Sequence, residues 1–324
     1  MSSWLHHSRP MPNKKPVVVN FGYRQLLPVG TTAVKTKDAT VISAFYTMQE
    51  KSLEVYKNYL RIFLEGCPCK LVFYTEESMV PFIRECRRAF EDTTDVVVID
   101  RKKWSANKIP QIAWDSLVVK DTTQPPQHKH TTDYYKFLYE KREFVKRTMT
   151  NNPFKSTDFM WVNPTICKDS RVIPLIKGFP NANRIVTDKL MLINQVPFEF
   201  SDEKVKTISG NNMIPIKESR IHSGIIAGTK EKWIQFSDLY ESTVKKFQMA
   251  GLPWGLDSII IGSFALENKD MVSLVEPKPI IDPLWKSMYG LLYFGSGPVL
   301  FSILTDKAMY EKKMGLDELL ALLS

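Results

Sequence analysis

The chain has little cysteine, and its cysteines form none of the spacings that mark a metal or redox motif. It holds only four in 324 residues: Cys67, Cys69, Cys86 and Cys167. They are too few and too scattered for a disulfide framework, and the pair Cys67-Pro-Cys69 lacks the two-residue spacer of a zinc or redox site. We therefore expect free thiols in a reducing compartment and predict a cytoplasmic protein.

The sequence also shows no targeting segment and no continuous apolar span. Residues 1–16 are polar and contain no apolar signal region. Residues 287–304 form an uncharged stretch near the lower limit for a membrane helix, but glycines and a proline interrupt it. We interpret this stretch as core strands and turns and predict no transmembrane span; peripheral association with a membrane surface stays open.

The composition excludes disordered and fibrous classes, because 44% of the residues are hydrophobic and 24% are charged. A net charge of +9 should attract polyanions, anionic membranes or phosphorylated ligands. The charge alone would suit a nucleic-acid binder. No basic base-reading helix, RNA-binding sheet signature or zinc spacing accompanies it, so we expect no nucleic-acid partner.

Strand and helix patterns alternate after a proline-containing N-terminal extension, residues 1–38. Strands are predicted at 40–46, 70–74 and 96–100, with helices at 51–65 and 80–90. Further elements are predicted as follows: a helix at 134–149, strands at 158–162 and 221–227, and helices at 230–249 and 257–264. These repeats predict an α/β fold with a mainly parallel sheet and helices on both faces, as one domain over residues 39–324.

Ligands of open α/β sheets bind beyond the carboxyl ends of the strands. Aromatic, hydroxyl and charged residues follow three predicted strands there: Phe45, Tyr46 and Thr47, then Tyr74, Thr75 and Glu76, then Asp100 and Arg101. Such groups would suit a nucleoside, through stacking and through bonds to the ribose. They equally suit strand ends and turns, so both interpretations stay open.

Lys141 lies inside the apolar stripe of the helix predicted at 134–149. A buried ammonium group needs a partner, and a phosphate entering the crevice would be a good one. The alternative is a lysine whose stem packs while its head reaches water.

Two segments further along could meet a sugar. His222 and Ser223 could bond sugar hydroxyls, and Gly224 would let a ligand approach the backbone closely. Trp254 offers a stacking surface, and Asp257 stands at the start of a predicted helix. The alternatives are a structural histidine, a buried tryptophan and a helix N-cap aspartate.

Several of these segments together resemble a known family. They are Lys141 to Arg171 with Asn152-Pro-Phe-Lys155 and Asp158-Phe-Met-Trp161, the strands at 40–46 and 72–75, and Ser223 to Gly228 with Asp257. Over about residues 40–276 the chain is similar to the bacterial HtrL/YibB-type proteins, which are regarded as glycosyltransferases of the GT-A type. The resemblance implies a GT-A-like, Rossmann-like domain.

The resemblance also implies where a metal would sit. The family pattern has an aspartate after the Trp-x pair, where a GT-A enzyme holds a divalent metal on the donor diphosphate; this chain has Asn163. A neutral amide oxygen is a weaker ligand for Mg²⁺ or Mn²⁺. Three alternatives stay open. Asp169 could hold the metal instead, or Lys141 and Arg171 could neutralise the diphosphate without a metal. The third is that catalysis is lost and only ligand binding is retained.

We therefore expect a glycosyltransferase that moves a sugar from a nucleoside diphosphate sugar to a hydroxyl acceptor, such as a glycan. The expected donor site comprises Phe45, Tyr46, Thr47, Lys141, Asn163 and Arg171. The expected acceptor site comprises His222, Ser223, Gly224 and Trp254. In the frame of the resemblance, Asp257 is the catalytic carboxylate, and Asn163 and Asp169 are the candidate metal ligands. The alternative is a catalytically inactive protein of the same fold that binds a sugar, a nucleotide or a partner.

Overall fold

The computed structural model describes residues 38–48, 53–122, 130–167, 170, 173, 179–180, 182, 185–194, 208, 211–215 and 220–275. The predicted N-terminal extension and the uncharged stretch at 287–304 lie outside the described residues, apart from residue 38. The division into an extension and one domain therefore stays a prediction.

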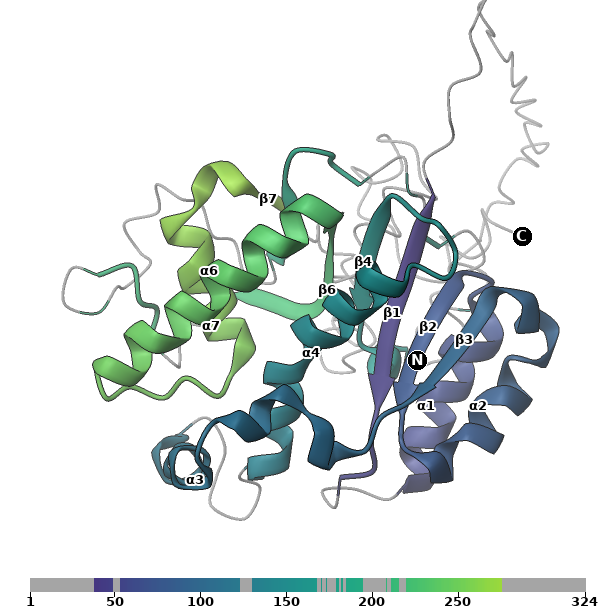
Figure 1. Ribbon diagram of the computed structural model, residues 1–324, viewed down its shortest axis with the longest axis horizontal. Coiled ribbons are helices and arrows are strands. Elements are labelled where there is room, and N and C mark those ends of the chain that lie inside the picture. Colours follow the sequence, from purple (N-terminus) through teal and green to yellow (C-terminus); the bar gives the residue numbers. More distant parts are fainter. Residues whose placement is uncertain are drawn as a thin grey trace, which may run out of the picture. The chain divides into compact units, whose positions relative to one another are not determined.

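A mixed sheet forms the centre of the described fold (Figure 1). Its strands are β1 (Ala39–Phe45), β2 (Lys70–Thr75), β3 (Thr94–Val98), β4 (Asp158–Val162), β5 (Leu190–Asn194), β6 (Ile221–Thr229) and β7 (Val272–Val275). They lie in the order β3-β2-β1-β4-β6-β5-β7. Strand β6 runs antiparallel to both of its neighbours, and all other pairs are parallel. The predicted mainly parallel sheet is confirmed.

Six α-helices accompany the sheet among the described residues: α1 (Leu53–Gly66), α2 (Val80–Cys86), α3 (Gln111–Lys120), α4 (Thr132–Asn151), α6 (Lys230–Met249) and α7 (Asp257–Glu267). Most lie within a few residues of the predicted ranges. Helix α2 is shorter than predicted, because a 3-10 segment, Arg88–Thr93, follows it. The sequence patterns did not predict α3, β5 or β7.

Alternating strand residues supply two separate cores, one on each face of the sheet. Ile42 and Trp161 point to the face covered by α4, α6 and α7, where they join Phe144 and Phe236. Val41 on β1 points to the opposite face, which is covered by α1 and α2. Burying one large apolar side chain in such a core contributes roughly 1.5–3 kcal/mol. The prediction of helices on both faces is thus confirmed.

The two long helices begin at residues that satisfy their first backbone N–H groups. The Thr131 hydroxyl accepts from the Tyr134 N–H at 3.2 Å, and the Thr229 hydroxyl accepts from the Lys232 N–H at 3.4 Å. Asn152, the residue that caps the C-terminal end of α4, has a left-handed φ of 36°. In the part of the chain that the structure describes, no helix combines the length and apolarity needed to cross a membrane.

Candidate functional site

The order of the strands favours a ligand-binding crevice at the carboxyl ends of β1 and β4, which we call the crevice position. From β1 the chain proceeds outward through β2 to β3, and β4 then starts again on the other side of β1. Such a reversal separates the loops that follow two neighbouring parallel strands, which leaves room for a ligand at the carboxyl edge. The predicted site residues Tyr46 and Asn163 follow the two strands that flank this reversal.

Three predicted site residues from three separate elements meet in direct contact. The Lys141 Nζ of α4 lies 2.6 Å from the Asp257 Oδ2 at the start of α7. The Ser223 hydroxyl of β6 donates to the other carboxylate oxygen, Asp257 Oδ1, at 2.8 Å. Lys141 Nζ also lies 3.4 Å from both Ser223 Oγ and the Ser223 carbonyl oxygen. We call these three residues the Lys141 cluster.

The charges of the Lys141 cluster are almost fully removed from water. The side chains of Lys141 and Asp257 are 10% and 5% exposed. Burying an ammonium and a carboxylate costs several kcal/mol each, so the pair persists only because both charges are matched. The Lys141 ammonium also lies 5.6 Å from the centre of the Trp161 ring, which adds a cation–π attraction.

The Lys141 cluster affects a neighbouring phenol. Burial and, secondarily, the negative charge of Asp257 raise the pKa of Tyr240 well above its ordinary value. Tyr240 therefore stays protonated at any physiological pH and cannot serve as a base.

A group of aromatic rings connects the Lys141 cluster with the end of β1. Its members are Tyr46, Tyr74, Trp104, Phe137, Phe144 and Trp161. We call them the aromatic cluster. Tyr46 meets Trp104 edge to face with ring centres 4.9 Å apart, and Phe144 stacks on Tyr74 at 4.7 Å.

The aromatic cluster contains a buried donor, the Trp161 Nε1, that lacks a hydrogen-bond partner among the described residues. The Tyr46 hydroxyl interacts with the Trp104 side chain; this interaction lowers the pKa of Tyr46, but burial has the larger effect and raises it. An unpaired buried donor costs about 1–3 kcal/mol, and such a group is most easily explained where a ligand supplies the missing acceptor.

Thr47 is held by an ion pair that joins the ends of three strands. Its N–H donates to Glu76 Oε1 at 3.0 Å, and its carbonyl accepts from the Arg101 guanidinium. Arg101 Nη2 lies 2.9 Å from Glu76 Oε2. Burial tends to raise the pKa of Glu76, but the hydrogen bonds from Thr47 and Arg101 outweigh it and lower that pKa. This network fixes the loop after β1 beside the crevice.

Asn163 links the loop after β4 to the predicted sugar-binding segment. Its N–H donates to the Gly224 carbonyl at 2.7 Å. The Gly224 N–H in turn donates to His222 Nδ1 at 3.1 Å. A Cβ placed on Gly224 would lie 2.3 Å from His222 Cε1, so glycine is what allows the histidine ring to fold over this backbone.

The described residues do not offer a ligand set for a divalent metal at Asn163. Its side-chain oxygen already accepts from the Thr165 N–H at 3.1 Å and the Thr165 hydroxyl at 2.9 Å, which caps a short 3-10 turn, Pro164–Ile166. No group of three His, Cys, Asp or Glu side chains suited to a metal occurs among the described residues. Asp169 and Arg171 lie outside them, so their proposed roles stay predictions.

Two predicted site residues lie apart from this arrangement. Phe45 points into the core on the opposite face of the sheet, where its ring contacts Tyr56 at 5.6 Å. Trp254 is 5% exposed and packs against Trp114 with ring centres 4.5 Å apart. Neither of these ring contacts involves a residue of the Lys141 cluster.

Sequence reasoning missed several members of the site. Trp104 lies on an irregular segment between strands, where no periodicity marks it. Glu140, one residue before Lys141, is fully buried and accepts from the Ser105 hydroxyl at 2.7 Å and the Ala106 N–H at 3.1 Å. Its position within an apolar stripe was the available signal, because a buried carboxylate needs partners just as Lys141 does.

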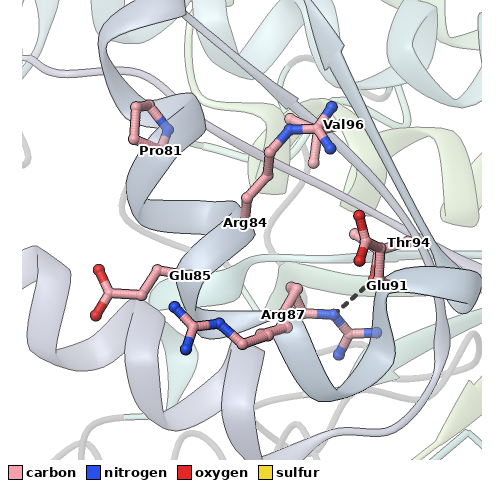
Figure 2. A pocket seen from close by; sticks show the side chains of 8 residues that line it. Pro81, Arg84, Glu85, Arg87, Glu91, Thr94 and Val96 are labelled. Atoms are coloured by element: carbon pink, nitrogen blue, oxygen red, sulfur yellow. Dashed lines mark hydrogen bonds between the residues drawn. The ribbon is translucent and has the colours of Figure 1, made fainter.

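Two cavities of the described structure lie elsewhere. One of about 310 Å³ is lined by residues of α2, the 3-10 segment that follows it and β3, among them Arg84, Arg87 and Glu91 (Figure 2). Another of about 440 Å³ lies between the end of β3 and the second half of α4. Neither is lined by a residue of the Lys141 cluster.

Comparison with known proteins finds solved structures that align with this chain and one family model. The crystal structure of mouse xyloside xylosyltransferase 1, apo form, aligns with 80% of this chain and 93% of its own chain, at 12% sequence identity and a TM-score of 0.45. No curated protein matches the sequence.

A family model described as "Bacterial protein of unknown function (HtrL_YibB)" matches residues 37–250. The match covers β1 through α6 and includes Lys141, Asn163 and Ser223, which confirms the resemblance over these residues. Trp254 and Asp257 lie beyond the matched range. The chain therefore belongs to the HtrL_YibB family.

Proposed function

We propose that this protein is a glycosyltransferase that moves a sugar from a nucleoside diphosphate sugar to a hydroxyl acceptor. The observation that supports it best is the meeting of Lys141, Ser223 and Asp257 beside the crevice position between β1 and β4. Sugar transfer needs a cation near the leaving diphosphate and a carboxylate near the acceptor hydroxyl. The Lys141 cluster contains one of each.

The proposed roles follow from the position of each group. The nucleoside would lie at the edge of the aromatic cluster, with the Trp161 Nε1 donating a hydrogen bond to it. Lys141 would balance charge on the diphosphate as the anomeric C–O bond breaks. Asp257 would accept a hydrogen bond from the acceptor hydroxyl that forms the new bond, and Ser223 would hold the carboxylate in place. No step is assigned to a metal.

The first test is thermal stabilisation by UDP, GDP, ADP and CMP, each with and without Mn²⁺. A nucleotide at 100 times its dissociation constant should add about 2.7 kcal/mol to the free energy of unfolding. Stabilisation by one nucleoside diphosphate would identify the donor class. No shift with any nucleotide, with or without Mn²⁺, would refute the donor site.

A pair of tyrosine variants makes the test specific to the aromatic cluster. Tyr46→Phe removes a hydroxyl that follows β1 at the proposed nucleoside site, so it should weaken nucleotide binding. Tyr135→Phe is the matched control, because its hydroxyl donates to Asp121 Oδ2 at 2.5 Å and lies outside the aromatic cluster. It should lower stability by about 1 kcal/mol and leave nucleotide binding unchanged. The reverse pattern would contradict the proposed nucleoside site.

A second candidate is a catalytically inactive protein that binds a nucleotide or sugar. It is favoured by Asn163, whose side-chain oxygen is engaged in a turn and carries no charge for a metal. Sugar transfer, or hydrolysis of the donor, by the wild-type protein would exclude this candidate. Nucleotide binding without any turnover would favour it.

A further inference from the structure

A third cavity, of about 430 Å³, opens between α3, α4, α6 and the loop that follows α6. Its floor is apolar and includes Ala113, Val244, Leu252 and Trp254. None of its lining residues belongs to the Lys141 cluster or to the aromatic cluster. Trp254, predicted as a sugar-stacking residue, therefore faces a separate cavity.

Three lysines line this cavity: Lys108, Lys120 and Lys245, and all three are exposed. Within the described residues none of them forms a salt bridge; Lys120 donates only to the Gly251 carbonyl, at 2.8 Å. The single carboxylate of the lining, Glu241, lies 3.6 Å from the Arg142 guanidinium and is thus already paired. The cavity therefore has an excess of positive charge.

The most exposed large apolar side chains of the described structure belong to the same two helices. Ile112 and Val119 on α3 are 79% and 76% exposed, and Met249 at the end of α6 is 89% exposed. The other exposed residues of this kind, Val55, Val98 and Ile234, reach only 40–45%.

These apolar side chains stand next to the lysines on the helices. Ile112 and Val119 are seven residues apart and so share one face of α3, and Val119 directly precedes Lys120. Met249 follows Gln248, which lines the cavity. Asp115 also lies on the outer side of α3, but its carboxylate accepts from Gln111 at 2.8 Å and from Thr132 at 3.1 Å.

We propose that this α3–α6 surface, defined by the three lysines and the three exposed apolar residues, docks on a bilayer that contains anionic phospholipids. Lysines attract the headgroup phosphates, and apolar side chains reach the boundary of the acyl chains. The cavity between them would admit a headgroup. A bilayer with anionic headgroups can contact the unpaired lysines and can also deform around single protruding apolar side chains. The proposal does not depend on sugar transfer.

The test is sedimentation of the full chain with vesicles of phosphatidylcholine alone, or of phosphatidylcholine with phosphatidylserine. Binding should require phosphatidylserine and should weaken as salt is added. Lys108→Gln/Lys120→Gln/Lys245→Gln should lose about fivefold in affinity for each lysine, on the order of a hundredfold in all. Ile112→Ser/Val119→Ser/Met249→Ser should lose about tenfold or more.

Matched controls separate this surface from general charge or apolarity. Arg84→Gln/Arg88→Gln/Lys103→Gln removes three exposed positive charges elsewhere, and Val55→Ser/Val98→Ser/Ile234→Ser removes the other exposed apolar side chains. Both controls should keep nearly all of the vesicle binding. Equal losses in the variants and their controls would overturn the proposal.

Three other outcomes would also overturn it. One is that the wild type binds both kinds of vesicle equally. The second is that the apolar variant turns a dimer into a monomer and leaves vesicle binding unchanged, which would identify a second copy of the chain as the partner. The third is that glycerol phosphate in solution stabilises the protein through these lysines while vesicles do not bind.

Discussion

At the scale of single residues, the Lys141–Asp257 pair is the interaction with the largest expected effect. Both charges are buried, and each is the principal partner of the other. Removing one partner leaves the other charge buried and unmatched, which is more costly than removing both.

Asp257→Asn should therefore lower the free energy of unfolding by about 3–5 kcal/mol. The double variant Lys141→Met/Asp257→Asn should lose less than the sum of the two single variants. Urea denaturation of the four proteins measures this coupling. If the single losses simply add, the pair does not stabilise the fold in the way described here.

Gly255 is a second residue at which one added atom should matter. A Cβ there would lie 2.5 Å from Tyr135 Cδ1, and the Tyr135 ring is 1% exposed and held by its hydroxyl bond to Asp121. Gly255→Ala should therefore cost about 1–3 kcal/mol through overpacking. Gly251→Asn is the control, because Gly251 has a φ of +69° that asparagine tolerates and open space around it. A larger loss in the control would contradict the overpacking argument.

At the scale of elements, buried charged groups connect segments that the sheet alone does not join. Glu140 of α4 binds Ser105 and Ala106 in the 3-10 helix Ser105–Lys108. Arg87, just after α2, binds main-chain carbonyls at the end of α1 and in the loop before β2.

Glu140 should make stability depend on pH. Burial raises its pKa above the ordinary 4.5, although the hydrogen bonds from Ser105 and Ala106 oppose the shift. The folded state then holds this proton at a higher pH than the unfolded chain does. Stability from this group is therefore present at low pH and lost as pH rises from about 4.5 through the raised value.

Glu140→Gln should remove that dependence. Relative to the wild type, the variant should gain stability as the pH rises from about 4 to about 7. Urea denaturation at several pH values measures the difference between the two proteins. A difference that is constant with pH, or that changes in the opposite direction, would show that Glu140 does not titrate as described.

We expect that lysine in place of Arg87 does not preserve the stability of the fold. Its guanidinium donates to the carbonyls of Leu64, Cys67 and Cys69 and to the Thr94 hydroxyl, the last shown by the dashed line in Figure 2. An ammonium group cannot reproduce this fork, so Arg87→Lys should cost about 3 kcal/mol or more. Its neighbour Arg88 is exposed, and Arg88→Lys should change stability by less than about 0.5 kcal/mol. Similar losses of stability in both variants would contradict the view that the Arg87 guanidinium holds these segments together.

At the scale of the whole molecule, the four thiols report on opening of the fold. All are buried, and burial raises the pKa of Cys86 to about 11. A thiol-labelling reagent needs both access and a thiolate. The native protein should therefore react slowly, and the denatured protein should react at all four thiols. Rapid labelling of one equivalent in the native protein would contradict this.

Much of the fold could be predicted because its elements have local signals. Strand β1 is a continuous β-branched and aromatic run, α6 carries an amphipathic pattern, and Thr131 and Thr229 mark helix starts. Helix α3 was not predicted, because both of its outer positions, Ile112 and Val119, are apolar and leave no amphipathic pattern. Strands β5 and β7 are short and are supported mainly by pairing with distant segments.

Local patterns were enough to predict the α/β class, the mainly parallel sheet and the family, because periodicity and motifs are local properties of the chain. For Lys141 they left two interpretations open, a buried ammonium that needs a partner and a side chain whose head reaches water. The packing of α4 against β6 and α7 shows that Lys141 is buried and that its partner is Asp257, 116 residues away, with Ser223 bonded to both. The same holds for the opposite orientations of Phe45 and Tyr46 and for the separate cavity at Trp254. Such contacts depend on how strands are ordered and helices are packed, and no short stretch of sequence specifies that order.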